Sequence, residues 1–322
     1  MIRPFARLRL VGVVGVAALI AAACSSGGGT AAPAGLEKTN LTVAAVPALD
    51  SAGLYIAQQR GLFAAEGLHV TIVPAISSAT VIAAQMAGKY DVTAGAYVAY
   101  MIADAVQHAN LRVLAPASTM APLTQEVMIP AGSPIRTVGD LKHKKIGVNA
   151  LNNIGTLLVS SLLADNGVSP NDVTFVPIPF PAMAGALKAH TVDAAWLPEP
   201  FITGAEESIG ATSLADVDQG ATQSLPVSGY ITTQSWLDKY PKTAAAFRRA
   251  VLRAQSIANS NLAAVQNGMV AYGGASRTTA QIAADPTFPL RSNPALLQRI
   301  AQLMEQFGMT QQVFNASSML RG

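Results

Sequence analysis

The chain lacks several features that would point to an enzyme or a nucleic-acid binder. It has one cysteine, Cys24, in 322 residues, so no disulfide can join two of its own residues. Only 12% of the residues are charged and 6% are aromatic. Its four histidines, His69, His108, His143 and His190, have no second His or Cys at metal-ligand spacing. Neither a G-x-S-x-G nor a GxxxxGK[ST] motif occurs, which argues against the common hydrolase and phosphate-binding sites.

The first 23 residues have the parts of a secretory signal peptide. Arg3, Arg7 and Arg9 precede an apolar stretch that runs from Leu10 to Ala23 without an acidic residue. This stretch is shorter than the roughly 20 residues of a membrane span, so a retained membrane helix is the weaker interpretation. We therefore expect residues 1–23 to be removed on export.

The position of Cys24 resembles the bacterial lipobox, whose cysteine is acylated and becomes the new N-terminus. Ala21 stands where that pattern prefers Leu. We expect Cys24 to carry lipid and to hold the protein at the outer face of the cytoplasmic membrane, with a Gly/Ser/Ala/Pro tether over residues 24–40. An incidental cysteine in the leader is the alternative.

Loss of the leader changes the charge balance. The whole chain has 21 Lys and Arg against 18 Asp and Glu, and a pI near 9.0. Three arginines leave with the leader, so the mature chain has 18 residues of each sign and is neutral. No long basic run interleaved with aromatics remains, so we expect no nucleic-acid partner.

From Leu41 the sequence alternates short β-branched runs with longer Ala/Leu-rich segments, in two series, of which the second begins at Asp140. Apolar strands separated by helical patterns predict an α/β fold with parallel sheets covered on both faces. The stretches "AAQMAGKYDVTAG" and "AGALKAHTVDAAW" both predict a helix, a turn, an aspartate and a strand. This similarity favours two lobes of related topology.

Two connecting stretches, "TQEVMIPAGSPIRTVG" and "QSLPVSGYITTQSW", lead into the second series and back out of it. We predict lobe one over residues 41–127 and 229–322 and lobe two over 128–228. Two crossing segments have the geometry of a hinge, and the ligand cleft would lie between the lobes.

Five stretches carry a resemblance to a known family: "GLYIAQQRGLFAAEGLHV", "AAQMAGKYDVTAGA", "VGDLKHKKIGVN", "ALKAHTVDAAWLPEPF" and "SWLDKYPKTAAAFRRAV". In this order they resemble the type 2 periplasmic solute-binding proteins of ABC importers, of the nitrate, sulfonate, taurine and thiamine-pyrimidine subgroup. The resemblance implies a monomer that is not an enzyme, needs no cofactor or metal, closes on a small-molecule solute, and delivers it to separate permease and ATPase subunits. His143 and His190 stand where the family usually has glycine; His190 follows a predicted helix, where a left-handed residue is wanted.

The yeast pyrimidine synthases resemble the same lobes and provide the alternative function, an enzyme of the same fold. They carry a cysteine-rich motif in the mature protein, which this chain lacks.

Ligands of open parallel sheets bind beyond the carboxyl ends of the strands, where loops enter helices. This rule, together with the family resemblance, gives the predicted binding residues Leu49, Asp50, Ser51, Ser77, Ser78, Gly95, Ala96, Tyr97, Asn149, Asn153, Gly155, Thr156, Trp196, Glu199 and Phe201. The polar members have a second interpretation as helix caps, Ser51 before a helix at Ala52 among them, and the aromatic members have one as core.

The predicted loops contain Asp50 and Glu199 but no Lys or Arg. Two carboxylates penalise a bare anion, whereas Tyr97, Trp196 and Phe201 could stack on a flat ring. We therefore expect an amine-bearing or heteroaromatic solute, such as a pyrimidine or taurine, rather than nitrate or a simple alkanesulfonate. Amides at helix N-termini could still hold a sulfonate.

Overall fold

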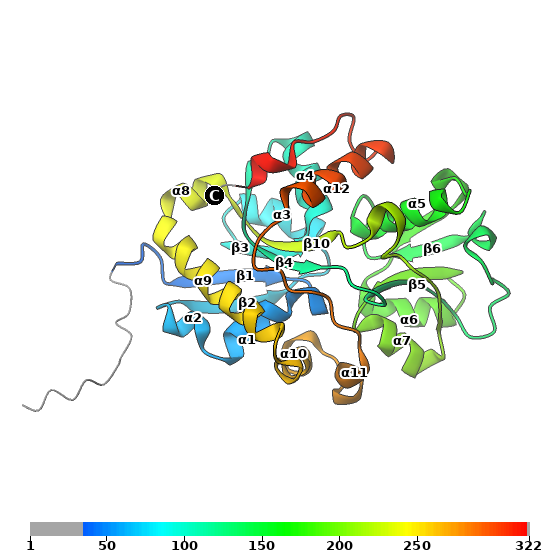
Figure 1. The fold of residues 1–322 in the computed structure, drawn as a ribbon, viewed down its shortest axis with the longest axis horizontal. Helices are drawn as coiled ribbons and strands as arrows, with labels where there is room; N and C mark the ends of the chain where they lie inside the picture. Colours follow the sequence, from blue (N-terminus) through cyan, green and yellow to red (C-terminus); the bar gives the residue numbers. More distant parts are fainter. Residues whose placement is uncertain (1–34, 321–322) are drawn as a thin grey trace, which may run out of the picture. The chain divides into compact units, whose positions relative to one another are not determined.

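The computed structural model describes residues 35–320, which form two five-stranded sheets with helices packed on them (Figure 1). The first sheet has the order β2-β1-β3-β10-β4 and defines lobe one. Its strands are β1 (Asn40–Ala45), β2 (His69–Pro74), β3 (Val92–Ala96), β4 (Leu111–Thr119) and β10 (Pro226–Thr233). The second sheet has the order β7-β6-β8-β5-β9 and defines lobe two. Its strands are β5 (Gln125–Ile129), β6 (Lys145–Val148), β7 (Thr174–Pro177), β8 (Ala194–Pro198) and β9 (Thr212–Asp216).

The helices follow the strands in the alternation that the sequence predicts. Lobe one carries α1 (Ala52–Gln59), α2 (Leu62–Ala65), α3 (Ser78–Met86) and α4 (Tyr97–Gln107). Lobe two carries α5 (Ile154–Asp165), α6 (Phe180–Lys188) and α7 (Phe201–Ile209). After β10 come α8 (Gln234–Lys239), α9 (Pro241–Ala258), α10 (Leu262–Gly268), α11 (Arg277–Ile282) and α12 (Pro294–Gln306). Proline opens α9 and α12, where its missing N–H costs nothing.

The two sheets have the same spatial arrangement of strands, although the antiparallel strand comes last along the chain in the first sheet and first in the second. β1 pairs in parallel with β2 and β3, and β6 pairs in parallel with β7 and β8. An antiparallel strand follows in each sheet, β10 beside β3 and β5 beside β8. The two-lobed α/β fold predicted from the repeated sequence pattern is therefore confirmed, but the predicted parallel sheets are mixed, because each contains one strand that runs against both of its neighbours.

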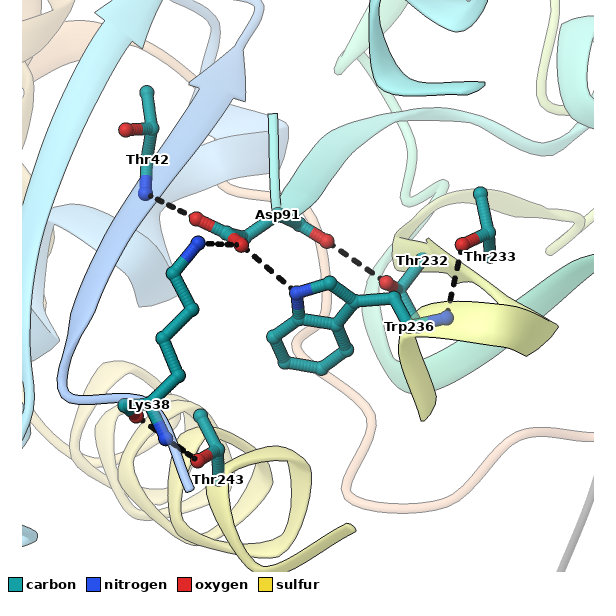
Figure 2. A network of polar contacts seen from close by, with 7 residues as sticks. All are labelled: Lys38, Thr42, Asp91, Thr232, Thr233, Trp236 and Thr243. Atoms are coloured by element: carbon teal, nitrogen blue, oxygen red, sulfur yellow. Dashed lines mark hydrogen bonds and ion pairs between the residues drawn. The ribbon is translucent and has the colours of Figure 1, made fainter. Parts of the chain in front are cut away.

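An aspartate before β3 and β8 makes the same hydrogen bond in each lobe. Asp91 accepts from the backbone N–H of Thr42 at 2.9 Å, and Asp193 accepts from that of Lys145 at 2.8 Å. Asp91 alone also accepts from Lys38 Nζ at 2.5 Å and Trp236 Nε1 at 2.8 Å (Figure 2). We call Asp91 and these three donors the Asp91 network; it ties the start of β1 to α8.

Two segments join the lobes, residues 120–124 between β4 and β5 and residues 217–225 between β9 and β10. They run side by side, because Met120 N donates to Leu225 O at 3.0 Å and Leu123 N donates to Asp216 Oδ2 at 2.7 Å. The boundaries drawn from the sequence, 127/128 and 228/229, fall inside β5 and β10. Both strands lie directly beside the hinge. The sequence analysis predicts connecting segments at these positions, whereas the structure has strands there.

Apolar side chains form two large clusters and a small one of Ala44, Ala75 and Val81. One of the large clusters lies in lobe one between β1, α1 and α9 and includes Leu54 and Phe247. The other extends from α4 through lobe two and includes Leu158 and, from α12, Ile300. The C-terminal helix α12 thus contacts α4 of lobe one and α5 of lobe two.

Several local predictions can be compared with the backbone. Helix α1 begins at Ala52, as predicted, and His190 has φ 53°, the left-handed conformation expected after α6. The predicted signal peptide, Cys24 and the first part of the tether lie outside the described residues. Within residues 35–320, no helix combines the length and apolar character that a membrane crossing needs.

Candidate functional site

A small cavity lies between the lobes, at the ends of strands from both sheets. Lobe one lines it with Val46, Ala48, Asp50, Ser51, Ser78, Gly95, Ala96, Val227 and Ser228; lobe two lines it with Asn149, Asn153, Ile154, Phe180, Trp196 and Pro198. Its volume is about 30 Å³, which is room for about two waters. The cavity is thus at the position where parallel sheets bind ligands.

Asp50 is the one charged side chain among the described residues that line this cavity. Its Oδ1 accepts from the Ser118 hydroxyl at 2.5 Å, and the Ser118 oxygen lies 2.8 Å from the Ser228 hydroxyl. Burial raises the pKa of the Asp50 carboxyl to about 6, and the hydrogen bond from Ser118 opposes this rise. No lysine or arginine is among the described residues that line the cavity, so a hydrogen-bond donor on a ligand would be the natural partner of this carboxylate.

Four helices begin at the cavity wall. Ser51 and Ala96 precede α1 and α4, Ser78 opens α3, and Asn153 precedes α5. The N-terminus of a helix carries roughly half a positive charge and unpaired N–H groups, which favour an acceptor or anionic group on a ligand. The site therefore offers acceptor character at Asp50 and donor character at the helix ends.

Two buried polar atoms of lobe two, Trp196 Nε1 and Asn149 Oδ1, have no hydrogen-bond partner among the described residues. Trp196 is 2% exposed and Asn149 is 8% exposed, and both line the cavity. Unpaired buried groups of this kind cost about 1–3 kcal/mol each, which a ligand acceptor and a ligand donor would recover.

Glycine lets the indole of Trp196 reach this position. A Cβ at Gly155 would lie 2.3 Å from Trp196 Cε3, so α5 can pack on the ring only without a side chain there. Gly95 has a comparable role, because its Cβ would lie 2.2 Å from the Ser78 hydroxyl oxygen.

Glu199 follows β8 and connects the lobes without lining the cavity. Its carbonyl oxygen accepts from Leu49 N at 3.2 Å, and its carboxylate accepts from Ala284 N at 3.3 Å, both in lobe one. The carboxylate also accepts from Thr203 Oγ1 at 2.8 Å and Thr203 N at 3.2 Å. Burial raises the pKa of Glu199 to about 7; the hydrogen bonds from Thr203 and Ala284 lower it, and the charge of Glu206 raises it further.

The structure brings part of the predicted set together at the cavity: Asp50, Ser51, Ser78, Gly95, Ala96, Asn149, Asn153 and Trp196. The others, Leu49, Ser77, Tyr97, Gly155, Thr156, Glu199 and Phe201, are not among the lining residues. Whether either group contacts a ligand stays a prediction.

Several predicted residues outside the cavity wall have structural contacts. Ser77 caps α3 and accepts from Thr80 N at 3.4 Å, while Thr156 Oγ1 donates to Asn153 O at 2.7 Å in the cap of α5. Tyr97 is buried where Gly229 leaves room for its ring. Ser51, in contrast, makes no side-chain cap; its hydroxyl donates to Val46 O at 2.9 Å.

Sequence reasoning missed Ser118, which bonds Asp50, and seven lining residues: Val46, Ala48, Ile154, Phe180, Pro198, Val227 and Ser228. The strand-end rule could have found several of them, because Val46, Ser118 and Pro198 lie at or just after the ends of β1, β4 and β8, and Phe180 follows β7. Val227 and Ser228 escape the rule because β10 runs antiparallel to its neighbours, so its beginning lies at the cavity.

A family model described as NMT1/THI5 like matches residues 48–264. The chain belongs to the NMT1/THI5-like family. The matched range includes all the lining residues from Ala48 to Ser228 and both hinge segments.

Among sequence relatives of this NMT1/THI5-like chain is the bicarbonate transport ATP-binding protein CmpC of Synechocystis, which is 27% identical over 237 residues and 68% of this chain. The chain spans about a third of that relative's length, 35%.

Among solved structures, the alkanesulfonate-binding protein SsuA of Xanthomonas axonopodis, bound to MOPS, is 16% identical with a TM-score of 0.76, covering 89% of this chain and 99% of that one. The periplasmic nitrate-binding protein NrtA of Synechocystis is 17% identical with a TM-score of 0.67, covering 76% and 69%.

The same fold also occurs in an enzyme. The desulfurization enzyme DSZB is 16% identical with a TM-score of 0.69, covering 88% of this chain and 96% of its own. Fold alone therefore does not separate binding from catalysis. Within residues 35–320, no group of three or more His, Cys, Asp or Glu side chains is placed to hold a metal ion.

Proposed function

We propose that this chain is the solute-binding component of an ABC importer and captures a small organic solute by closing its lobes on it. The observation that carries the proposal is the cavity itself: both lobes line it, and two of its lining residues have buried polar atoms, Trp196 Nε1 and Asn149 Oδ1, without a partner in residues 35–320. The alkanesulfonate-binding protein SsuA and the nitrate-binding protein NrtA share the fold, which supports the same class of function. Permease and ATPase would be separate subunits.

The side chains of the site also indicate which class of ligand it would bind. Asp50 favours a ligand N–H group, while the N-termini of α3 and α5 and the Trp196 indole favour an acceptor. A zwitterion such as taurine presents both groups, and so does an aminopyrimidine whose ring extends beyond the cavity. Nitrate presents acceptors only and would face the Asp50 carboxylate. We therefore expect nitrate and simple alkanesulfonates to bind less tightly than an amine-bearing solute.

A thermal-shift experiment on the protein without its leader tests both statements. Taurine, an aminopyrimidine, methanesulfonate and nitrate are each titrated, and a ligand at about 100 times its Kd should stabilise the fold by about 2.7 kcal/mol. Asp50→Asn should weaken binding of the amine-bearing ligands by about tenfold or more, since a charge-assisted hydrogen bond is lost. Asp172→Asn, which removes a carboxylate from the exposed pair with Lys142, is the matched control.

Three outcomes would contradict the proposal at different points. Strong stabilisation by nitrate or methanesulfonate that Asp50→Asn leaves undiminished would overturn the ligand class. Stabilisation by none of the probes would overturn the solute-binding function. Chemical conversion of a probe would favour the enzyme alternative, for which the fold shared with DSZB is the supporting observation.

For location, we propose an extracytoplasmic lipoprotein anchored through Cys24 and acting as a monomer. The support is the leader and lipobox pattern in the sequence and the similarity in fold to NrtA, which is a periplasmic protein.

A further inference from the structure

A groove of about 230 Å³ adjoins the cavity, between α6 and α7 of lobe two and the turn at residues 273–276 of lobe one. Its walls include Phe180, Leu197, Phe201, Gly204 and Ala275, and none of the described residues that line it is charged. The groove is therefore an uncharged and predominantly apolar compartment between the lobes, several times larger than the cavity.

The hydroxyl groups in the groove are already bonded within the protein. Ser208 donates to the carbonyl oxygen of Gly204 at 2.5 Å, and Ser276 and Thr279 bond to each other at 2.7 Å. Thr279 further donates to Glu207 Oε2 at 2.6 Å. These hydroxyls consequently offer a ligand little hydrogen bonding, which leaves apolar contact as the main interaction.

A row of aromatic rings joins the cavity to the groove. Trp196 lines the cavity, Phe201 lines the groove, and Phe180 lines both. The Phe180 and Trp196 ring centres are 5.5 Å apart, and the Phe180 and Phe201 rings stack at 5.0 Å with an interplanar angle of 22°. One molecule that passes Phe180 would thus contact both compartments.

We propose that the groove receives an apolar, ring-sized part of the solute whose polar head occupies the cavity. The proposal rests on the solute-binding function proposed above and extends its substrate class to a polar head with an aromatic or branched apolar tail. The volumes agree with this division. The cavity, at about 30 Å³, admits only a small head. The groove, at about 230 Å³, is larger than a cavity of about 150 Å³ that binds benzene.

Gly204 provides a way to fill the groove without straining the fold. A Cβ there meets no atom within 4 Å, and neither does one at Gly185 on the exposed side of α6. Gly204→Leu places a side chain in the groove, and Gly185→Leu adds the same side chain outside it. Both replace a helical glycine, so both should keep or raise helix stability.

The test measures binding of matched probe pairs by titration calorimetry: methanesulfonate with benzenesulfonate, and acetamide with benzamide. In the wild type and in Gly185→Leu, the phenyl member of at least one pair should bind about tenfold or more tightly than the methyl member. Gly204→Leu should abolish this preference and leave the affinity for the methyl member unchanged. Phe201→Ser should reduce the preference without filling the groove.

The outcomes separate this inference from the proposed function. If methyl probes bind and the phenyl preference is absent in the wild type, or is unchanged in Gly204→Leu, the groove proposal is wrong and solute binding stands. If no probe binds to the wild type, solute binding of this head class fails and the groove proposal fails with it.

Discussion

At the scale of single residues, Glu199 gives the clearest pH dependence. Burial raises the pKa of Glu199 from 4.5 to about 7. The Glu199 carboxyl therefore holds its proton more tightly in the folded protein than in the unfolded chain. The stability it contributes is therefore fully present below about pH 4.5 and is lost as the pH rises through about 7. Asp50, whose pKa burial raises from 3.8 to about 6, acts in the same direction. We expect the free energy of unfolding to fall by about 1–3 kcal/mol between pH 5 and pH 7.5, measured by urea unfolding.

Glu199→Gln should remove part of that fall. The amide oxygen of the glutamine can still accept from Thr203 or Ala284, but the amide does not titrate. The free energies of unfolding at pH 5 and pH 7.5 should therefore lie closer together than in the wild type. The control is Glu207→Gln, because the Glu207 carboxylate also accepts a hydrogen bond from the other lobe, from Thr279 Oγ1. This variant should retain the wild-type pH dependence. An unchanged pH dependence in Glu199→Gln would contradict the assignment.

The sequence predicted single residues where one local rule decides their position. The left-handed His190 and the strand-end residues Asp50, Ser78 and Asn149 are of this kind. The bonding of Glu199 is not, because its partner Ala284 lies 85 residues along the chain and belongs to the other lobe. No local pattern encodes that contact, so the sequence predicts Glu199 only as a ligand-binding residue.

At the scale of elements, the repeated aspartates Asp91 and Asp193 allow a paired prediction. Asp91 is 6% exposed and serves three donors, whereas Asp193 is partly exposed and accepts one side-chain hydrogen bond. Asp91→Asn turns an NH₂ group toward these donors and should cost about 2–4 kcal/mol of unfolding free energy. Asp193→Asn should cost about 0.5–1.5 kcal/mol.

Urea unfolding of both variants at one pH measures the difference. Neither aspartate lines the cavity, so the affinity for a bound solute should stay the same in both folded variants. Equal losses in the two variants would show that the Lys38 and Trp236 bonds of Figure 2 contribute little.

The alternation of helices and strands was predictable because each buried strand is a short apolar run between longer helical patterns. The elements beside the hinge were harder to predict. β5 begins at Gln125 with polar residues, Gln125 and Glu126, that are nevertheless buried, so the sequence favoured a connection there. β10 runs against its neighbours, and sequence pattern alone does not give strand direction.

At the scale of the whole molecule, the two sheets follow from the repeated pattern, but the contents of the interface between the lobes do not. The cavity and the groove depend on residues that come from β10, α6 and the turn after α10. These segments meet only after both sheets have formed and the chain has crossed the hinge twice. Interface geometry of this kind is a property of the assembled fold.

The described chain also limits how a lipid anchor could act on the molecule. The Glu37 carboxylate accepts from Lys242 N at 3.2 Å and Thr243 N at 3.0 Å, and Lys38 belongs to the Asp91 network. Lobe one therefore holds the chain from Glu37 onward. Even fully extended, the residues between Cys24 and Glu37 span no more than about 45 Å. A lipid on Cys24 would thus keep Glu37, where the chain joins lobe one, within about that distance of the membrane surface.

We expect Cys24→Ser to release the protein from the membrane without changing its affinity for solute. The acyl chain would be lost, while the contacts of Glu37 and Lys38 that separate the tether from the cavity remain. Cell fractionation of the wild type and the variant measures release, and titration of the purified proteins measures affinity. A variant that stays wholly in the membrane fraction would show that the leader is an uncleaved anchor. A soluble variant with weaker solute binding would show that the N-terminal segment reaches the site.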